Sequence, residues 1–493
     1  MVESFKNIIN STDLAIPLLK LLLVITVAIN AYGLFSPILA SNDANFYSVV
    51  AKHIVASNDW INLTFAGSDW LDKPHLPFWL TAISYKIFGI NTFAYILPGF
   101  LFHILGSYYT YRIAKYLYNE QVGILSALIY FSSIRLMLSA IDIRAEAFLL
   151  GEIIPACYYW LRYNNSDKIR FKYLILGAIF TALALMTKGI FVLLTITSGL
   201  IAIWIYERKL GNFFTWKWLL ALSLSFVFAL PEFVSLYLQF DLHPEKLVFG
   251  KYNVSGIKFF LLDSQFGRFF DTGPITSGKP QNFGHYFFFI HAFMWAFLPW
   301  TLIFIAAIVA SVKVLRTKPE IANENTPVTA SIASQSQNNI FNKKVNLYYL
   351  FGSFLPTFIL FSLTRFQLDH YTNILIPFAG ILCAAWIFSH ITIRELIIQD
   401  SRTLKYFQNV KLLFYLQIGL AIILVILVSR VSFLLFSGSV LIYNEVACVF
   451  VFLLFLIFRR NSNINKAIIY PVLAINLVFG LATVVNNKGS LFY

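Results

Sequence analysis

Charged residues stand at the edges of long apolar runs in this chain, where charge is costly without a partner or a task. Asp43 lies just beyond the first apolar run, at the start of NDANFYSVVAKHI. A carboxylate at the edge of an apolar region is a suitable proton acceptor, so Asp43 is a candidate catalytic base. The alternative, which is compatible with catalysis, is that Asp43 caps the helix that follows.

A second group of charges lies in SAIDIRAEAFLL, where Asp142, Arg144 and Glu146 fall within five residues of sequence. Such charges at membrane depth usually face a cavity or a partner. Their density therefore favours a site in which the acids act in catalysis and Arg144 binds substrate. The simpler alternative is a structural cluster in which Arg144 neutralises the two acids.

Single cations follow in other segments. Lys73 stands in the stiff Asp72-Lys73-Pro74 turn, and Lys188 interrupts two apolar runs in ALMTKGIFV. Arg268 and His285 flank the end of a later polar segment. We expect these four basic residues to contact a lipid phosphate and Asp72 to contact substrate, whereas their alternative roles are those of interfacial or solvated side chains.

A short polar turn, TRFQLDHY, adds Gln367 and His370. In a transporter such a turn could couple protons, and in a transferase it could hold the polar groups of a sugar. Together, the acids and cations suit displacement at an anomeric carbon with a lipid phosphate as the leaving group, because cations offset the charge on the departing phosphate. No cofactor or metal is required, since Lys and Arg can clamp phosphate, and nothing indicates a divalent metal.

The elements that position these residues are membrane helices. The chain is 59% hydrophobic and only 12% charged, with a mean hydropathy of +0.72, whereas a soluble domain carries about 25% charged residues. Its apolar runs are long enough to cross a bilayer as helices. We predict an all-α polytopic protein with about 13 spans, near 15–38, 92–116, 121–140, 144–162, 171–187, 189–206, 217–239, 284–312, 346–363, 371–391, 411–430, 432–458 and 467–486.

The positions of the charges predict the topology. Despite a net charge of +14, a nucleic-acid partner is not expected, because most Lys and Arg lie in loops on one side of the predicted membrane. The N-terminus is then cytoplasmic, and two large loops, 40–91 and 240–283, face the opposite side. The first loop has apolar residues at helical spacing, which predicts helices lying in the interface plane.

The domain organisation follows from composition. Residues 319–342 are polar and predict a disordered cytoplasmic linker, which divides an N-terminal catalytic module (1–318) from C-terminal transmembrane helices (343–493). The three cysteines, Cys157, Cys383 and Cys448, lie inside apolar runs and are expected to be buried and unpaired.

An ordered set of motifs resembles the GT-C glycosyltransferases of the protein O-mannosyltransferase and lipid A aminoarabinose transferase kind. The motifs are NDANFYSVVAKHI, LDKPHLPFWLTA, ALMTKGIF, SQFGRFF, HYFFFIHAFMWAFLPW and DHYTNILIPF. The resemblance implies that Asp43 is the base or an acceptor-site acid and that Lys73 and Arg268 contact the lipid phosphate. Glu146 then stands at the second acid position, with Asp142 as the alternative.

The resemblance also implies a function. It predicts transfer of a sugar from a polyprenyl phosphate, such as undecaprenyl phosphate, to a protein, lipid or glycan, with inversion, on the periplasmic side of a bacterial inner membrane. Three departures concern the acceptor: Ala44 follows Asp43 where the family often has Glu, Glu146 replaces the usual Asp, and the chain ends soon after its last predicted span. The alternatives are a secondary transporter or lipid flippase, and a polymerase or ligase of surface polysaccharide.

Overall fold

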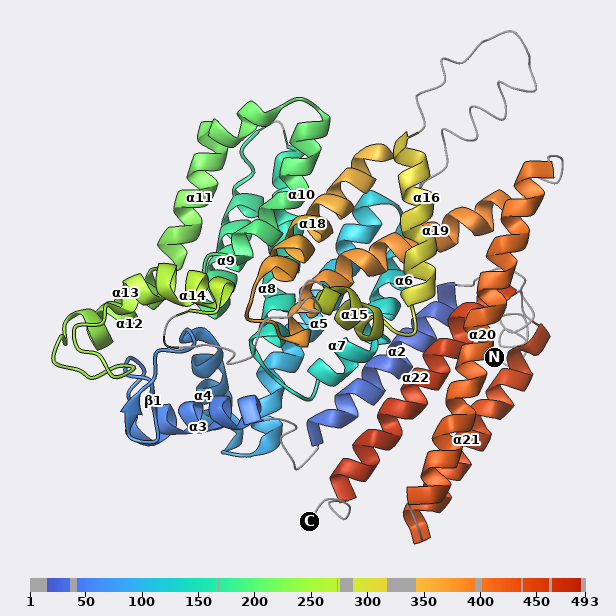
Figure 1. Ribbon diagram of the computed structural model, residues 1–493, viewed down its shortest axis with the longest axis horizontal. Coiled ribbons are helices and arrows are strands. Elements are labelled where there is room, and N and C mark those ends of the chain that lie inside the picture. Colours follow the sequence, from blue (N-terminus) through green and yellow to red (C-terminus); the bar gives the residue numbers. More distant parts are fainter. Residues whose placement is uncertain are drawn as a thin grey trace.

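The structure is a computed structural model that describes residues 16–35, 42–166, 168–272, 274, 287–316, 343–394, 401–435, 438–460 and 463–488. Over these ranges the chain is helical except for one small hairpin (Figure 1). The predicted linker 319–342 and His285 lie outside the described residues, so the division of the chain at 319–342 stays a prediction.

The longer helices form wherever the sequence has a long apolar run, because a helix satisfies its own backbone hydrogen bonds. They are α2 (Ile16–Tyr32), α5 (Thr92–Leu117), α6 (Glu120–Phe131), α8 (Ala145–Asn164), α9 (Phe171–Lys188), α10 (Val192–Tyr206), α11 (Trp216–Phe228), α16 (Thr301–Arg316), α18 (Lys344–Leu363), α19 (Ile376–Arg394), α20 (Ser401–Leu435), α21 (Gly438–Ile457) and α22 (Asn463–Lys488).

The remaining elements connect these helices and shape the loops. They are η1 (Gly33–Phe35), α3 (Asn42–Ser57), β1 (Thr64–Phe65), β2 (Ser68–Asp69), α4 (Leu76–Phe88), α7 (Ile134–Ser139), η2 (Leu210–Phe214), α12 (Leu230–Leu236), η3 (Tyr237–Asp241), α13 (Gly256–Lys258), η4 (Phe259–Asp263), α14 (Ser264–Phe270), α15 (Phe288–Ala296), η7 (Asp369–Leu375) and η8 (Phe458–Arg460).

The described helices confirm an all-helical, multi-span membrane protein. Six of them are long and apolar enough to cross a bilayer, and up to eight spans result if each of two bent helix pairs counts as one. Shorter apolar helices, α6 and α10 among them, fall below that length. The predicted total of 13 spans therefore stays a prediction.

The core of the bundle joins helices that are far apart in the sequence. Helix α8 packs between α5 and α9, α18 packs along α10, and α19 packs along α6. Close approach of α5 and α8 depends on Gly151, because a Cβ there would clash with the backbone of Phe102, a small-residue contact typical of membrane helices. The three cysteines are buried and free, as expected.

The two large loops meet beside this bundle. The first loop folds into α3 and α4, which confirms its two helical segments, and the β1–β2 hairpin lies between them. In Figure 1, α3, α4 and β1 lie below α12 and below α13 and α14 of the second loop. His75 of the first loop and Glu232 of α12 form a buried pair, Nδ1 to Oε1 3.0 Å apart, which fixes the first loop against the helix that precedes the second loop.

Candidate active site

Two cations from the two loops meet at Asp72. The Lys73 Nζ lies 2.8 Å from the Asp72 carboxylate, and the Arg268 guanidinium of α14 pairs with the other carboxylate oxygen. Arg268 also donates to the backbone carbonyl of Asp72 at 3.1 Å. Lys73 and Arg268, separated by almost 200 residues of sequence, are thus brought together by one acid.

Charge and burial also alter the titration of this group. Burial alone would raise the pKa of Asp72, but Lys73 and Arg268 outweigh it and hold the pKa below its usual value. Burial, and after it the positive charge of Arg268, lower the pKa of Lys73 to about 8, although Asp72 opposes them. A further anion beside Lys73 would therefore be favourable, because it would offset the repulsion between the two cations.

Backbone contacts hold α14, and so Arg268, in place. The backbone N–H of Phe366 donates to the carbonyl of Arg268 at 3.2 Å, and that of Arg365 donates to Phe269 at 2.9 Å. On its other side the Gln265 side chain donates to the backbone carbonyl of Lys188 at 3.2 Å. Helix α14 is therefore fixed between the end of α9 and the loop before η7.

Lys188 and Glu146 form the next pair. Lys188 ends α9 and Glu146 lies in the first turn of α8, which are the helix ends that favour a cation and an anion respectively. Their Nζ and Oε1 atoms are 2.5 Å apart, and Lys188 also lies over the Tyr371 ring at 4.5 Å. The chain turns sharply directly after Lys188, because Gly189 has a φ of +94°.

A third group of charges surrounds Arg144. Its guanidinium lies 3.2 Å from Asp43 and 3.0 Å from Asp142. The same guanidinium donates to the His370 Nδ1 at 3.1 Å, and the His370 Nε2 lies 3.7 Å from the second oxygen of Glu146. A continuous series of contacts therefore runs from Asp43 to Lys188.

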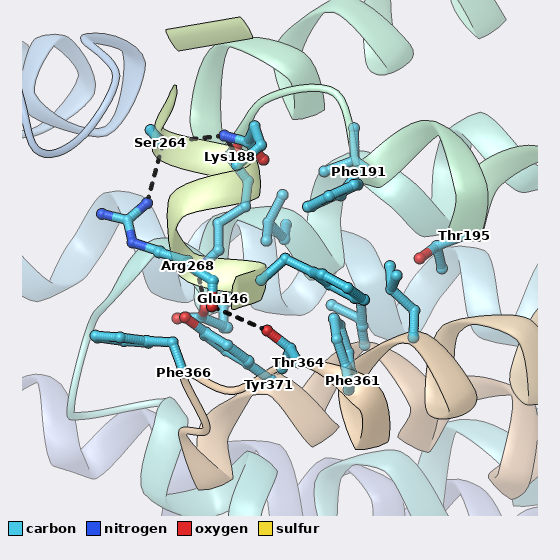
Figure 2. Close-up of a pocket in the computed structure, with 16 residues that line it drawn as sticks. Glu146, Lys188, Phe191, Thr195, Ser264, Arg268, Phe361, Thr364, Phe366 and Tyr371 are labelled. Carbon is cyan, nitrogen blue, oxygen red and sulfur yellow. Dashed lines mark hydrogen bonds and ion pairs between the residues drawn. The ribbon is translucent and has the colours of Figure 1, made fainter. Parts of the chain in front are cut away.

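These groups border a pocket with a largely apolar wall. Lys188 and Arg268 lie on one side of it in Figure 2, whereas Phe191 and Thr195 lie on the other. A second, smaller hollow shares Lys188 and Arg268 and adds Asp72 and Lys73. The pocket is lined by Glu146, Leu149, Lys188, Phe191, Val192, Thr195, Ser264, Gln265, Arg268, Phe269, Leu360, Phe361, Thr364, Phe366, Tyr371 and Ile374.

Most of the predicted site residues gather in this region. The contacts above join Asp43, Asp72, Lys73, Asp142, Arg144, Glu146, Lys188, Arg268 and His370. Gln367 lies in the adjacent loop, between Phe366 of the pocket wall and η7. His285 lies outside the described residues, so its predicted phosphate contact stays a prediction.

Two structural alternatives are corrected by the geometry. Arg144 pairs with only one of the two acids of its own segment, Asp142, and also with Asp43, whereas Glu146 pairs with Lys188. Asp43 is not the residue before a helix, because α3 already begins at Asn42. Asp142 and Glu146 thus pair with different cations, although the catalytic roles of the acids remain predictions.

Sequence reasoning missed Tyr371, Ser264 and Gln265, which line the pocket. Ser264 was detectable, because it lies four residues before Arg268 and helical spacing places such residues on one face; Arg268 donates to its hydroxyl at 3.3 Å. Tyr371 carried no such signal, since only the folded chain brings it over Lys188. Within the described ranges, no three His, Cys, Asp or Glu residues are grouped as a metal site.

Comparison with known proteins confirms the resemblance to the GT-C glycosyltransferases that the sequence motifs indicated. Residues 72–234 match the family model "Dolichyl-phosphate-mannose-protein mannosyltransferase". The fold matches a crystal structure of ArnT from Cupriavidus metallidurans bound to undecaprenyl phosphate, with a TM-score of 0.66 and 17% identity over 97% of this chain and 79% of that chain. It also matches the structure of ArnT in the apo state, with a TM-score of 0.65 and 18% identity over 95% of this chain and 76% of that chain.

Curated relatives agree on the family. An undecaprenyl phosphate-alpha-4-amino-4-deoxy-L-arabinose arabinosyl transferase of Proteus mirabilis is 22% identical over 71% of this chain and 55% of its own length. One from Pseudomonas fluorescens is 24% identical over 37% of this chain and 32% of its own length. The chain thus spans about half or less of the length of these relatives.

Proposed function

We propose that this protein transfers a sugar from a polyprenyl phosphate carrier to an acceptor at the membrane surface. The observation that carries the proposal is the convergence of Lys73, Lys188 and Arg268, from three separate segments, beside an apolar pocket. Cations at the edge of an apolar cavity suit a ligand with a phosphate and a lipid tail, because each part finds a complementary surface.

The proposed reaction inverts the anomeric centre. Asp43 removes the proton from the acceptor, whose oxygen or nitrogen attacks the anomeric carbon while the bond from that carbon to the phosphate oxygen breaks. The electron pair leaves with the phosphate, and Lys73 and Arg268 offset its charge. Arg144 holds the Asp43 carboxylate toward the site, at 3.2 Å. Gln367 and His370 are proposed to contact the substrate's polar groups.

The family supports a specific carrier and setting. The similarity to undecaprenyl phosphate-dependent transferases supports undecaprenyl phosphate as the carrier lipid. A bacterial inner membrane with the pocket on the periplasmic side agrees with the loop charges, and nucleotide sugars are not found there. Membrane lipids surround the helices, and the acceptor is a protein, a lipid or a glycan.

The test is binding of a short-chain polyprenyl phosphate to purified protein at pH 7, where Lys73 is charged. Lys73→Ala and Arg268→Ala should each weaken binding roughly 10- to 150-fold, since loss of a charge-assisted contact costs about 1.5–3 kcal/mol. Lys246→Ala is the matched control, because this lysine pairs with Asp69 at 3.0 Å and does not line the pocket.

Normal binding by both Lys73→Ala and Arg268→Ala would overturn the donor site. A transporter or lipid flippase would then account better for the charged pocket. Weak binding by the Lys246→Ala control as well would show instead that any loss of positive charge from these loops lowers affinity.

A further inference from the structure

Two arginines that pair with no carboxylate in the described part of the chain lie at the other end of the helices that carry the candidate site. Glu146 lies in the first turn of α8 and Arg162 in its last turn, which are separated by about 24 Å along the helix axis. Arg112 lies near the end of α5, which packs against α8. The pair is therefore close to the opposite face of the membrane.

The two guanidiniums converge on a single hydroxyl group. Arg112 donates to the Tyr158 Oη at 2.7 Å and Arg162 donates to the same atom at 3.3 Å. Each also donates to a second tyrosine, Arg112 to Tyr108 at 2.7 Å and Arg162 to Tyr173 at 2.8 Å. Two positive groups are thus held beside one buried phenol, and a nearby anion would reduce the repulsion between them.

The neighbouring acids are already occupied. Within the described part of the chain, no carboxylate pairs with either arginine, because Glu120 pairs with Lys115 at 3.3 Å and with Lys20 at 3.8 Å. Glu207, at the same end of the bundle, pairs with Lys209 at 3.0 Å. Among the residues that the structure describes, no carboxylate therefore offsets the charge of the two guanidiniums.

Tyrosine rings enclose the arginines and extend toward lipid. The Arg162 guanidinium lies 4.8 Å from the Tyr116 ring and 5.2 Å from the Tyr173 ring. Tyr108 and Tyr116 are 47% and 36% exposed on helix α5. Aromatic rings with hydroxyl groups are favoured where the hydrocarbon meets the headgroups, so the anion most available to this cluster is a lipid phosphate.

We propose that Arg112 and Arg162, with Tyr108, Tyr158 and Tyr173, form a binding site for the phosphate of an anionic phospholipid. The two guanidiniums each retain N–H groups that are not used by the tyrosines, and these donate to the phosphate oxygens. The tyrosine rings contact the glycerol and the upper acyl chains. This site is independent of the proposed transfer reaction, because it lies at the opposite end of α8 from Glu146.

The experiment compares purified protein in nanodiscs of phosphatidylcholine with and without phosphatidylglycerol. Native mass spectrometry should show phosphatidylglycerol retained at least 10-fold over phosphatidylcholine, and the thermal midpoint should rise with it. In the double variant Arg112→Gln, Arg162→Gln both effects should be lost. Lys172→Gln is the matched control, because it removes one exposed charge at the start of α9.

Three results would overturn the site. The first is unchanged phosphatidylglycerol retention in the double variant, a readout that does not depend on its stability. The second is an equal rise of the midpoint with inorganic phosphate, which would indicate a site for a free anion. The third is a large fall of the thermal midpoint in phosphatidylcholine caused by Asp167→Asn. Asp167 lies outside the described residues, and this result would identify it as the counter-ion of the two arginines.

Discussion

At the scale of single residues, the candidate site depends on which acid serves which cation. Asp72 contacts both Lys73 and Arg268, and Glu146 contacts both Lys188 and His370. Asp43 and Asp142 instead share one cation, Arg144. Of these acids, Glu146 is 3% exposed and Asp43 is 49% exposed. An acceptor molecule reaches an exposed carboxylate more easily, which favours Asp43 as the base and leaves Glu146 to position Lys188.

Replacement of Asp43 by Asn should therefore abolish most of the transfer while preserving the fold and carrier binding. Loss of a general base typically costs 10²- to 10⁴-fold in rate, and the amide still fits the space beside Arg144. The measurement is turnover of purified enzyme with a radiolabelled lipid-linked sugar, with the exposed Asp263→Asn as the control. Undiminished turnover in Asp43→Asn would remove this residue from the reaction.

At the scale of elements, three short pieces of backbone bring the cations together: the turn after β2, the end of α9 and helix α14. The turn at Gly189 is the most restrictive of them. Its φ of +94° is rare for other residues, and a Cβ there would lie 2.5 Å from the Gln265 Nε2. A side chain at 189 would displace the Gln265 amide from the Lys188 carbonyl, which is a contact that holds α14 at the end of α9.

Gly189→Ala should accordingly lower stability by about 1–3 kcal/mol, the usual cost of such backbone strain, and weaken carrier binding by displacing Arg268. Thermal unfolding and lipid binding would be measured together. Gly211→Ala in η2 is the control, since a Cβ there meets nothing within 4 Å. Equal tolerance of the two substitutions would show that the contact between α14 and α9 does not position the site.

The difference between sequence and structure is clearest at this scale. Apolar runs predicted the long helices because burial in lipid leaves few other backbone conformations. Charges inside those runs predicted Glu146, Lys188 and Arg144, because such charges are costly without a function. Their pairing was not predictable, since Glu146 pairs with a residue 42 positions away and His75 with Glu232, which is 157 positions away. Such pairs depend on how the loops fold.

At the scale of the whole molecule, the two faces of the membrane have different chemistry. The acids and cations of the pocket lie at one end of α8 and α9, whereas the arginine–tyrosine cluster lies at the other. Loop charges predict that the pocket faces the periplasm.

Thiol labelling of intact cells would test this orientation. Single cysteines at positions 65 and 275 should react with an impermeant reagent from the periplasm, whereas a cysteine at position 330 should react only after the membrane is opened. The three native cysteines are buried and give little background. The reverse pattern would place the pocket in the cytoplasm and make nucleotide sugars available as donors.

Finally, the 2.5 Å pair between Lys188 and Glu146 has a consequence for the order of events. Lys188 lines the pocket. A lipid phosphate that binds there therefore attracts Lys188 and weakens the ion pair between Lys188 and Glu146. Glu146 then has His370 as its remaining partner, at 3.7 Å, and the histidine contacts Arg144 beside Asp43. We therefore expect compulsory-order kinetics, in which the donor binds first and the freed carrier leaves last. Free polyprenyl phosphate should inhibit competitively against the donor and noncompetitively against the acceptor, whereas parallel double-reciprocal lines would contradict this order.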